Sequence, residues 1–367
     1  MAQNQTQLDV VEYKKLFEYT QLITGLYLLP FISVFGIIGS FFNILVYKNS
    51  KKYSTNVYLI ALSVSDILKL INDLMYFLVN LISKLDKSLG NYFFNKLYQY
   101  SHYIFVMTAI NTAWLTCSIA LDRYFILMYN RGHQKYRKYF FSILMSIFIA
   151  FVSCVIAIPS PLFLKSIDEV DPRTNKTYTK VGESTLNGSK FKIVYNYFNA
   201  MFRAFIPLVI IIYLDLKTIR IVYEKKMKNK SNNKNLHKKE KSKSKITIML
   251  IVIVLTFTIC MFPDAIMTMM QLGYANETYL VRTIREVTDL LLAINSATTF
   301  PICYYFSIQY RAKLKELLGV KKSVEKRINN HKKTLVTVEN ASLMATKIND
   351  ESPNLMCKKF TCRRAQI

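Results

Sequence analysis

The stretch WLTCSIALDRY, residues 114–124, decides the fold, because it places an acid and a base side by side at the end of a long apolar run. That run covers about residues 100–129 and exceeds the roughly 20 residues that a helix needs to cross about 30 Å of hydrocarbon. Ionised groups are costly inside a bilayer and mark function there. Asp122 and Arg123 stand where the run ends, so we expect them at a membrane surface.

Other apolar runs accompany this one, and each is long enough to span a membrane as a helix. The seven runs cover about residues 22–47, 57–82, 100–129, 139–164, 195–222, 246–272 and 279–306. Backbone groups in lipid have to bond within their own segment, so helices are the expected form. The sequence therefore predicts an all-α membrane protein with a seven-helix domain at 21–306. A short amphipathic stretch at 307–318 predicts an eighth helix on the membrane surface.

The basic residues predict how the chain is oriented. The formal net charge is +26, but the lysines and arginines fall in gaps between apolar runs, which argues against nucleic-acid binding and for membrane topology. They concentrate in the loops after the first, third and fifth runs and from residue 311 onward. Those segments are predicted to be cytoplasmic. Residues 1–20 then form an extracellular N-terminus, and we expect a multi-pass protein of the plasma membrane.

The segments outside the apolar runs suggest modest roles. The basic loop at 223–245 is expected to be a disordered, topology-setting loop that can also attract anionic lipid at about 1 kcal/mol per charge. The tail at 319–367 is expected to be disordered, with Cys357 and Cys362 as free thiols. No cysteine lies in a predicted outer loop, so no extracellular disulfide is expected. Four sequons on the predicted outer side are glycosylation candidates: Asn4, Asn175, Asn187 and Asn276.

Further motifs, taken in chain order, resemble those of rhodopsin-class G-protein-coupled receptors. The first run contains GIIGSFFNILVY with Asn43, and the second contains LSVSD, which ends at Asp66. The fifth run contains Pro207, the sixth contains FTICMFP at 257–263, and the seventh contains NSATTFPICY at 295–304. Together with the Asp-Arg-Tyr motif, they cover essentially the whole membrane portion.

The resemblance implies an activation switch that faces a heterotrimeric G protein and, after activation, arrestin. In the family, the acid and base of this motif pair in the resting state, and activation frees Arg123. Proline removes a backbone donor and kinks a helix, so Pro263 would give the sixth helix a pivot. The residues expected to carry this switch are Asp122, Arg123, Tyr124, Pro207, Phe257, Pro263, Pro301 and Tyr304.

The resemblance also implies a polar network around the mid-membrane acid of the second run. A charge at that depth needs polar partners. The family fold would bring together Asn43, Asp66, Thr112, Asn295, Ser296 and Thr299. In the family such a cluster holds a sodium ion, and oxygen ligands suit a hard cation. A water-filled network without a specific cation is an equal alternative, and we expect no other cofactor or metal.

The chain departs from the family pattern at several positions. Tyr98 stands where the third helix usually carries a disulfide-bonded Cys. The seventh run has Thr299-Phe300 in place of Asn-Pro, with Cys303 in the usual Tyr position. Pro301 and Tyr304, one residue later, are expected to substitute.

The ligand is expected to be a peptide. Phe105 stands where amine receptors hold the ligand ammonium, which argues against an amine. The stretches FRAFIPLVIIIYLDLKTI (202–219) and VTDLLLAINSATTF (287–300) resemble invertebrate FMRFamide-type neuropeptide receptors. Such amidated peptides carry an Arg, which implies a pocket of acids and aromatic rings. The expected pocket residues are Asp264 and Asp289 first, then Asp73, Glu286, Phe105 and Phe262. Structural bridges to Arg203, Arg282 or Arg285 are the alternative for each acid.

Other functional classes fit the sequence less well. The chain has no H-E-x-x-H motif or Gly-rich phosphate loop, and its four His are scattered, so we do not expect an enzyme. No internal repeat is visible and only nine glycines are present, which argues against a transporter. A chemosensory or orphan receptor of the same class, with a small-molecule ligand, stays open because the outer disulfide is missing.

Overall fold

The computed structural model describes residues 2–50, 53–128, 135–170, 177–183, 190–229, 237–273 and 278–319. The chain divides into two compact units, Met1–Arg311 and Ala312–Ile367. The first unit holds nearly all of the described secondary structure. The predicted sites at Asn175, Asn187, Asn276, Cys357 and Cys362 lie outside the described residues.

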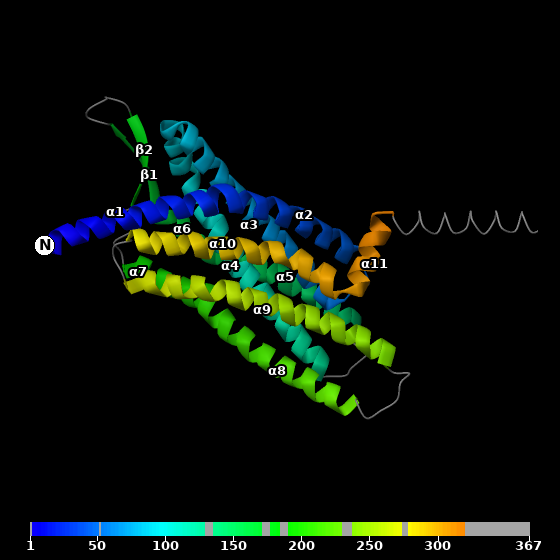
Figure 1. Cartoon of the computed structure of the whole chain (residues 1–367). Coiled ribbons are helices and arrows are strands. Elements are labelled where there is room, and N and C mark those ends of the chain that lie inside the picture. Colours follow the sequence, from blue (N-terminus) through cyan, green and yellow to red (C-terminus); the bar gives the residue numbers. More distant parts are fainter. Residues whose placement is uncertain are drawn as a thin grey trace, which may run out of the picture. The chain divides into compact units, whose positions relative to one another are not determined.

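Helices dominate the described part of the chain (Figure 1). The first continuous segment joins α1 (Ala2–Gln21), η1 (Leu22–Leu28) and α2 (Leu29–Lys48), where η denotes a π-helix. Next come α3 (Ser54–Leu85), α4 (Lys87–Met128), α5 (Lys135–Ala157) and the short α6 (Pro159–Leu162). They are followed by α7 (Lys190–Ala200), η3 (Met201–Phe205), α8 (Ile206–Asn229), α9 (His237–Gly273), α10 (Tyr279–Phe306) and α11 (Ile308–Leu317). Apart from α11, the described helices group into seven continuous segments, one for each predicted apolar run.

Judged by length and composition alone, fewer than seven of these helical segments qualify as membrane spans. Among the described residues, the stretches that pass as spans are Val11–Lys48, Ser88–Met128, Tyr139–Leu162 and Ile248–Thr268, with the bent pair of α10 and α11 as a fifth. Helices α3 and α8 do not pass, and each carries three charged residues within one span's length. In α3 these three residues are Asp66, Lys69 and Asp73, and their side chains are largely withdrawn from solvent. Charges that face the interior of a bundle lower the mean hydropathy of a helix without excluding it from a membrane.

Each π-helical segment ends two residues before a proline. Pro30 follows η1, and Pro207 follows η3. A proline lacks the N–H that would bond four residues back, and its ring collides with that carbonyl, so the preceding turn widens. At η3 the N–H of Ile206 bonds to the carbonyl oxygen of Met201, five residues back. The widened turn contains Arg203, whose side chain is buried.

A β-hairpin follows α6, in a loop to which the all-α prediction assigned no strands. Strand β1 (Leu164–Val170) pairs antiparallel with β2 (Thr177–Glu183), and Leu164 lies opposite Glu183. Thr177, Tyr178, Thr179 and Val181 have the β-branched or aromatic side chains that favour strands.

The bundle is apolar on its outside and partly polar within. Large apolar side chains such as Phe31, Phe151 and Ile259 are exposed on the helix surfaces, whereas Ser33, Asn43 and Asp66 are fully buried. This is the reverse of a soluble protein, and it fits a bundle whose outer surface meets lipid. The helices α2, α3 and α10 come especially close together: a Cβ added at Gly36 would lie 2.6 Å from Leu70 Cδ1 and 3.0 Å from the Ala297 backbone.

Candidate functional site

A large cavity opens between α1, α3, α4, η3, α9 and α10. Its volume is about 430 Å³, counted as the space that the centre of a water molecule can reach. Its lining includes four acids and three arginines: Asp73, Asp264, Glu286, Asp289, Arg203, Arg282 and Arg285. Aromatic rings complete the wall, among them Phe17, Tyr76, Phe94, Tyr98 and Phe105. We call this space the large cavity.

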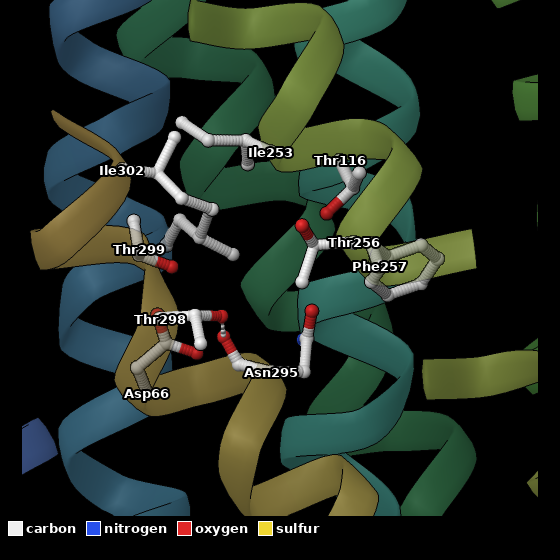
Figure 2. Close-up of a pocket in the computed structure, with 10 residues that line it drawn as sticks. Asp66, Thr116, Ile253, Thr256, Phe257, Asn295, Thr298, Thr299 and Ile302 are labelled. Atoms are coloured by element: carbon white, nitrogen blue, oxygen red, sulfur yellow. Dashed lines mark hydrogen bonds between the residues drawn. The ribbon is translucent and has the colours of Figure 1, made fainter. Parts of the chain in front are cut away.

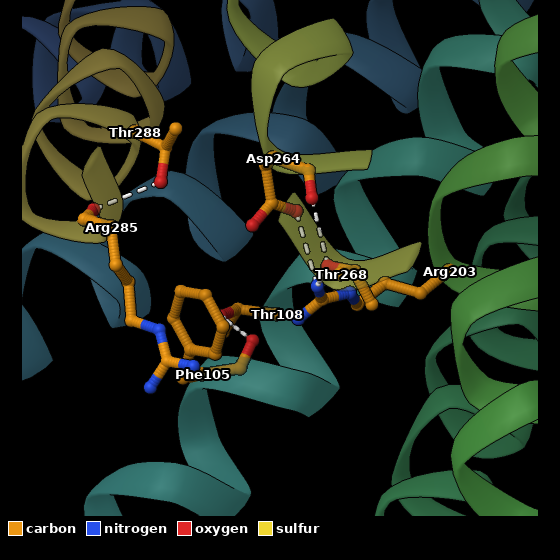
Figure 3. Close-up of polar contacts among 7 residues, drawn as sticks. All are labelled: Phe105, Thr108, Arg203, Asp264, Thr268, Arg285 and Thr288. Carbon is orange, nitrogen blue, oxygen red and sulfur yellow. Dashed lines mark hydrogen bonds and ion pairs between the residues drawn. The ribbon is translucent and has the colours of Figure 1, made fainter. Parts of the chain in front are cut away.

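Asp264 is already paired. Arg203 Nη2 donates to Asp264 Oδ2 at 3.1 Å and to Thr268 Oγ1 at 2.6 Å, and both charged side chains are buried (Figure 3). The guanidinium also lies 5.5 Å from the centre of the Phe105 ring, a cation–π distance. Of the two predictions for Asp264, the structural bridge to Arg203 is the one found here. Asp264 therefore shapes the large cavity and is less open to a ligand than we expected.

Two more of the predicted acids have partners within the bundle. Asp73 Oδ2 lies 2.5 Å from Lys69 Nζ, one helical turn away on α3. Glu286 Oε1 accepts a hydrogen bond from the hydroxyl of Tyr76 at 3.0 Å. Asp289 differs from them: among the described residues no ion pair or hydrogen bond to its carboxylate is found, although it lines the large cavity.

Phe262 does not contribute to this cavity. Its side chain is 52% exposed on the surface of α9, whereas the neighbouring Met261 is buried. Successive residues on a helix point about 100° apart, so only one of these two neighbours faces the interior. The prediction that Phe262 forms a pocket wall is corrected accordingly, and Phe105 keeps that role.

A second, small cavity lies beside Asp66, deeper in the bundle (Figure 2). Its volume, counted in the same way, is about 10 Å³. This is room for about one water molecule. Asp66, Asn295 and Thr299 line it together with Phe257, so the structure gathers these predicted residues. Both carboxylate oxygens of Asp66 are buried without a hydrogen-bond partner in the described chain. Unpaired buried polar atoms are costly, so such a site favours a water or a cation.

The other predicted members of this network have partners of their own. The Thr112 hydroxyl lies 3.0 Å from that of Ser65. Asn43 Oδ1 accepts a hydrogen bond from the Tyr310 hydroxyl at 2.8 Å, so it ties the start of α11 to α2. Ser296 is buried, and its side chain is a polar neighbour of the Asp66 carboxyl. The network is therefore narrower than predicted, and it centres on Asp66, Ser296, Asn295 and Thr299.

The Asp-Arg-Tyr motif lies near the end of α4 and contacts the start of α3. Asp122 accepts hydrogen bonds from Ser54 Oγ at 2.7 Å and from Thr55 Oγ1 at 2.6 Å. Arg123 Nη2 donates to the same Thr55 Oγ1. We expected a direct pair between Asp122 and Arg123, but no ion pair joins them in the described chain. Neighbouring residues on a helix do not face each other, and a hydroxyl from α3 bridges them instead. Tyr124 follows on α4 and packs edge-on against the Phe125 ring.

The proline-containing helices position the remaining switch candidates. Pro207 accepts a hydrogen bond from Cys117 Sγ at its carbonyl oxygen, 3.6 Å away, and Pro263 and Pro301 lie inside α9 and α10. Cys303 is fully buried and accepts a hydrogen bond from the Tyr47 hydroxyl at 3.0 Å. Tyr304, in contrast, is 43% exposed. The structure therefore places Cys303, and not Tyr304, on the inner face of α10.

Several residues at these sites were not singled out from the sequence. Ser54 and Thr55 are common polar residues at the start of a helix, and nothing local marks them as partners of a residue 68 or 67 positions later. Lys69 could have been noticed, because a base three residues after Asp66 in an apolar run is unusual. Tyr310 carried no comparable signal.

Comparison with known proteins adds the family. The model of the 7 transmembrane receptor (rhodopsin family) matches residues 41–304, which is more than half of the chain. A search of curated proteins finds no match. The match confirms the predicted all-α seven-helix fold and the predicted class, and members of this family are receptors and not enzymes. The chain belongs to the rhodopsin family of seven-transmembrane receptors, and it is a multi-pass membrane protein that signals through G proteins.

Proposed function

We propose that this receptor binds an extracellular neuropeptide, amidated and FMRFamide-like, and that it does so at the plasma membrane with its N-terminus outside. The orientation rests on the basic loops after the first, third and fifth helical segments. With that orientation the large cavity opens to the outside. The peptide class rests on the resemblance of residues 202–219 and 287–300 to FMRFamide-type receptors.

One observation carries the proposal: Asp289 is an acid in the wall of a large, partly aromatic cavity, and no described residue forms an ion pair with it. An ionised carboxylate that is partly withdrawn from water gains most from a charged, hydrogen-bonding partner. The guanidinium of a peptide Arg supplies that partner. Phe105 and Tyr76 offer aromatic surface to the neighbouring Phe side chains of such a peptide.

Binding would shift the bundle toward a state in which Arg123 leaves Thr55 and contacts a heterotrimeric G protein, with arrestin binding later. Pro207, Pro263 and Pro301 are proposed as the positions where helices bend during this change, and Phe257 as the packed residue between them and Asp66. At the small cavity, Asp66, Ser296 and Thr299 would hold a sodium ion if one binds. The unpaired oxygens of Asp66 support this assignment.

A receptor for a small molecule is the second candidate. A cavity of this size lies within the range of about 300–1,000 Å³ that is common for small-ligand sites. Such a chemosensory or orphan receptor would share the fold and the Arg123 switch, and would differ only in the ligand.

The decisive experiment is a calcium and cyclic-AMP reporter assay in cells that express the full chain, challenged with amidated peptides. We expect a dose-dependent response to RF-amide peptides. In an Asp289→Asn variant the potency should fall at least about tenfold, because one charge-assisted hydrogen bond is lost. Glu18→Gln is the matched control, since Glu18 is an exposed acid on α1. Silence of a surface-expressed receptor toward every peptide would favour the small-molecule candidate.

A further inference from the structure

We infer that Lys69 is a built-in competitor for the cationic group of the ligand: its ammonium pairs with Asp73, at the level of Asp289, and it sets how strongly the large cavity binds a cation. The inference rests on the proposed function in one respect, because it assumes that the ligand carries a cationic group.

The packing of α3 against α10 places Asp73 level with Asp289. Two contacts fix the register of these antiparallel helices. The Tyr76 hydroxyl donates to Glu286 at 3.0 Å, and about two turns farther along, Leu70 packs in one buried cluster with Ala293. Asp73 lies midway between Tyr76 and Leu70, and Asp289 lies about midway between Glu286 and Ala293. Both acids also line the large cavity.

Two facing carboxylates at one level of a bundle repel each other unless a cation lies between them. Lys69 supplies a cation at Asp73. It is only 6% exposed, its ammonium lies 2.5 Å from Asp73, and it is within electrostatic range of both Asp289 and Asp66. A buried lysine is costly unless it is paired, so its position is determined by these acids.

The wall of the large cavity near Lys69 also contains a polar group without a hydrogen-bond partner in the described chain. Asn72 lines the large cavity and is 5% exposed, and its Oδ1 has no hydrogen-bond partner in the described chain. Asn72 and Asp73 both line the large cavity. A guanidinium that entered between Asp73 and Asp289 would find an additional acceptor there, which an ammonium on a tether from α3 leaves unused.

This arrangement makes Lys69 a specificity determinant. A ligand cation can occupy the acidic pair only by sharing it with Lys69 or by displacing the Lys69 ammonium from Asp73. A simple ammonium ion forms too few directed hydrogen bonds to displace the Lys69 ammonium from Asp73. A guanidinium has several directed donors, so it can replace every contact that it breaks. The receptor therefore selects an Arg-like group over a simple ammonium.

The test uses the purified full-length receptor and a matched pair of probes, N-acetyl-arginine amide and the uncharged N-acetyl-citrulline amide. The measured quantity is the probe concentration that gives half of the maximal rise in melting temperature. We expect Lys69→Met to lower this concentration for the arginine probe about tenfold or more, since a competing charge is removed. Asp73→Asn should raise it by a similar factor, because Lys69 then turns to the remaining acids. The double variant should return close to the wild-type value.

Two controls sharpen the result. Lys84→Met removes the same charge from an exposed position near the end of α3 and should change nothing. The citrulline probe should respond alike to all variants. If Lys69→Met does not fold, Asp73→Asn and the double variant still decide, because weaker binding in the first and recovery in the second support competition.

The inference is overturned if Lys69→Met weakens binding of the arginine probe or leaves it unchanged. It is equally overturned if the probe stabilises neither the wild-type receptor nor the Lys69→Met variant. Binding of the probe together with silence to all RF-amide peptides would instead count against the proposed peptide ligand and leave the role of Lys69 standing.

Discussion

Thr55 bridges Asp122 and Arg123: its hydroxyl donates to Asp122 Oδ2 at 2.6 Å and accepts a hydrogen bond from Arg123 Nη2. The hydroxyl is therefore satisfied in both roles. It connects the start of α3 to the end of α4, and it is an uncharged hydrogen-bond acceptor for the Arg123 guanidinium. A guanidinium held in this way is released at lower cost than one in a buried ion pair.

We predict that Thr55→Val raises ligand-independent signalling. Valine keeps the shape of the side chain but removes the acceptor for Arg123, and one hydrogen bond to a charged group contributes about 1.5–3 kcal/mol. Basal activity in a reporter assay should rise about tenfold or more, since about 1.4 kcal/mol corresponds to a factor of ten. Thr258→Val is the control, because the hydroxyl of Thr258 bonds only to the carbonyl of Val254 in its own helix. Unchanged basal activity in the Thr55 variant would show that this bridge does not restrain the receptor.

We predict that Arg123→Ala abolishes signalling while the receptor still reaches the cell surface. Arg123 contributes one described hydrogen bond and has a buried Nε without a partner, so its removal costs the fold little. The comparison is between reporter output and surface labelling of the same cells. Wild-type signalling from a well-expressed variant would exclude Arg123 from the switch.

Much of the fold could be predicted from local patterns, because each predicted span is a long and mainly apolar run and the loop charges are uneven. The site was harder, since it depends on which face of a helix turns inward and on register between helices. Met261 and Phe262 are adjacent and both apolar, so the sequence could not show that Met261 is buried and Phe262 exposed. Cys303 and Tyr304 present the same problem, and the more polar residue is the one that faces outward.

Contacts between distant residues could not be derived from the sequence at all. Arg203 pairs with Asp264 across 61 residues, and only the widened turn before Pro207 together with the packing of α9 brings them together. From the sequence, this bridge and ligand binding are equal alternatives for Asp264. A single sequence contains no information that separates the two.

We predict that Arg203→Met destabilises the receptor strongly. Removing one partner of a buried ion pair leaves the other charge uncompensated, at a cost of about 3–5 kcal/mol. The melting temperature of the purified protein should fall, and Arg203→Met combined with Asp264→Asn should recover much of the loss. A double variant no more stable than the single one would show that Arg203 acts through its packing on Phe105 and its bond to Thr268 instead.

We predict that Gly39→Ala destabilises the bundle far more than Gly25→Ala does. A Cβ at Gly39 would lie 2.7 Å from Phe300 Cβ and 2.9 Å from Phe300 Cγ, so α2 and α10 would have to move apart. Overpacking of this kind costs about 1–3 kcal/mol. A Cβ at Gly25 would have Asn80 Nδ2 as its nearest neighbour at 3.6 Å, an ordinary contact. The two melting temperatures, measured side by side, check the prediction, and equal values would mean that α2 and α10 pack less closely than the contact of Gly39 with Phe300 indicates.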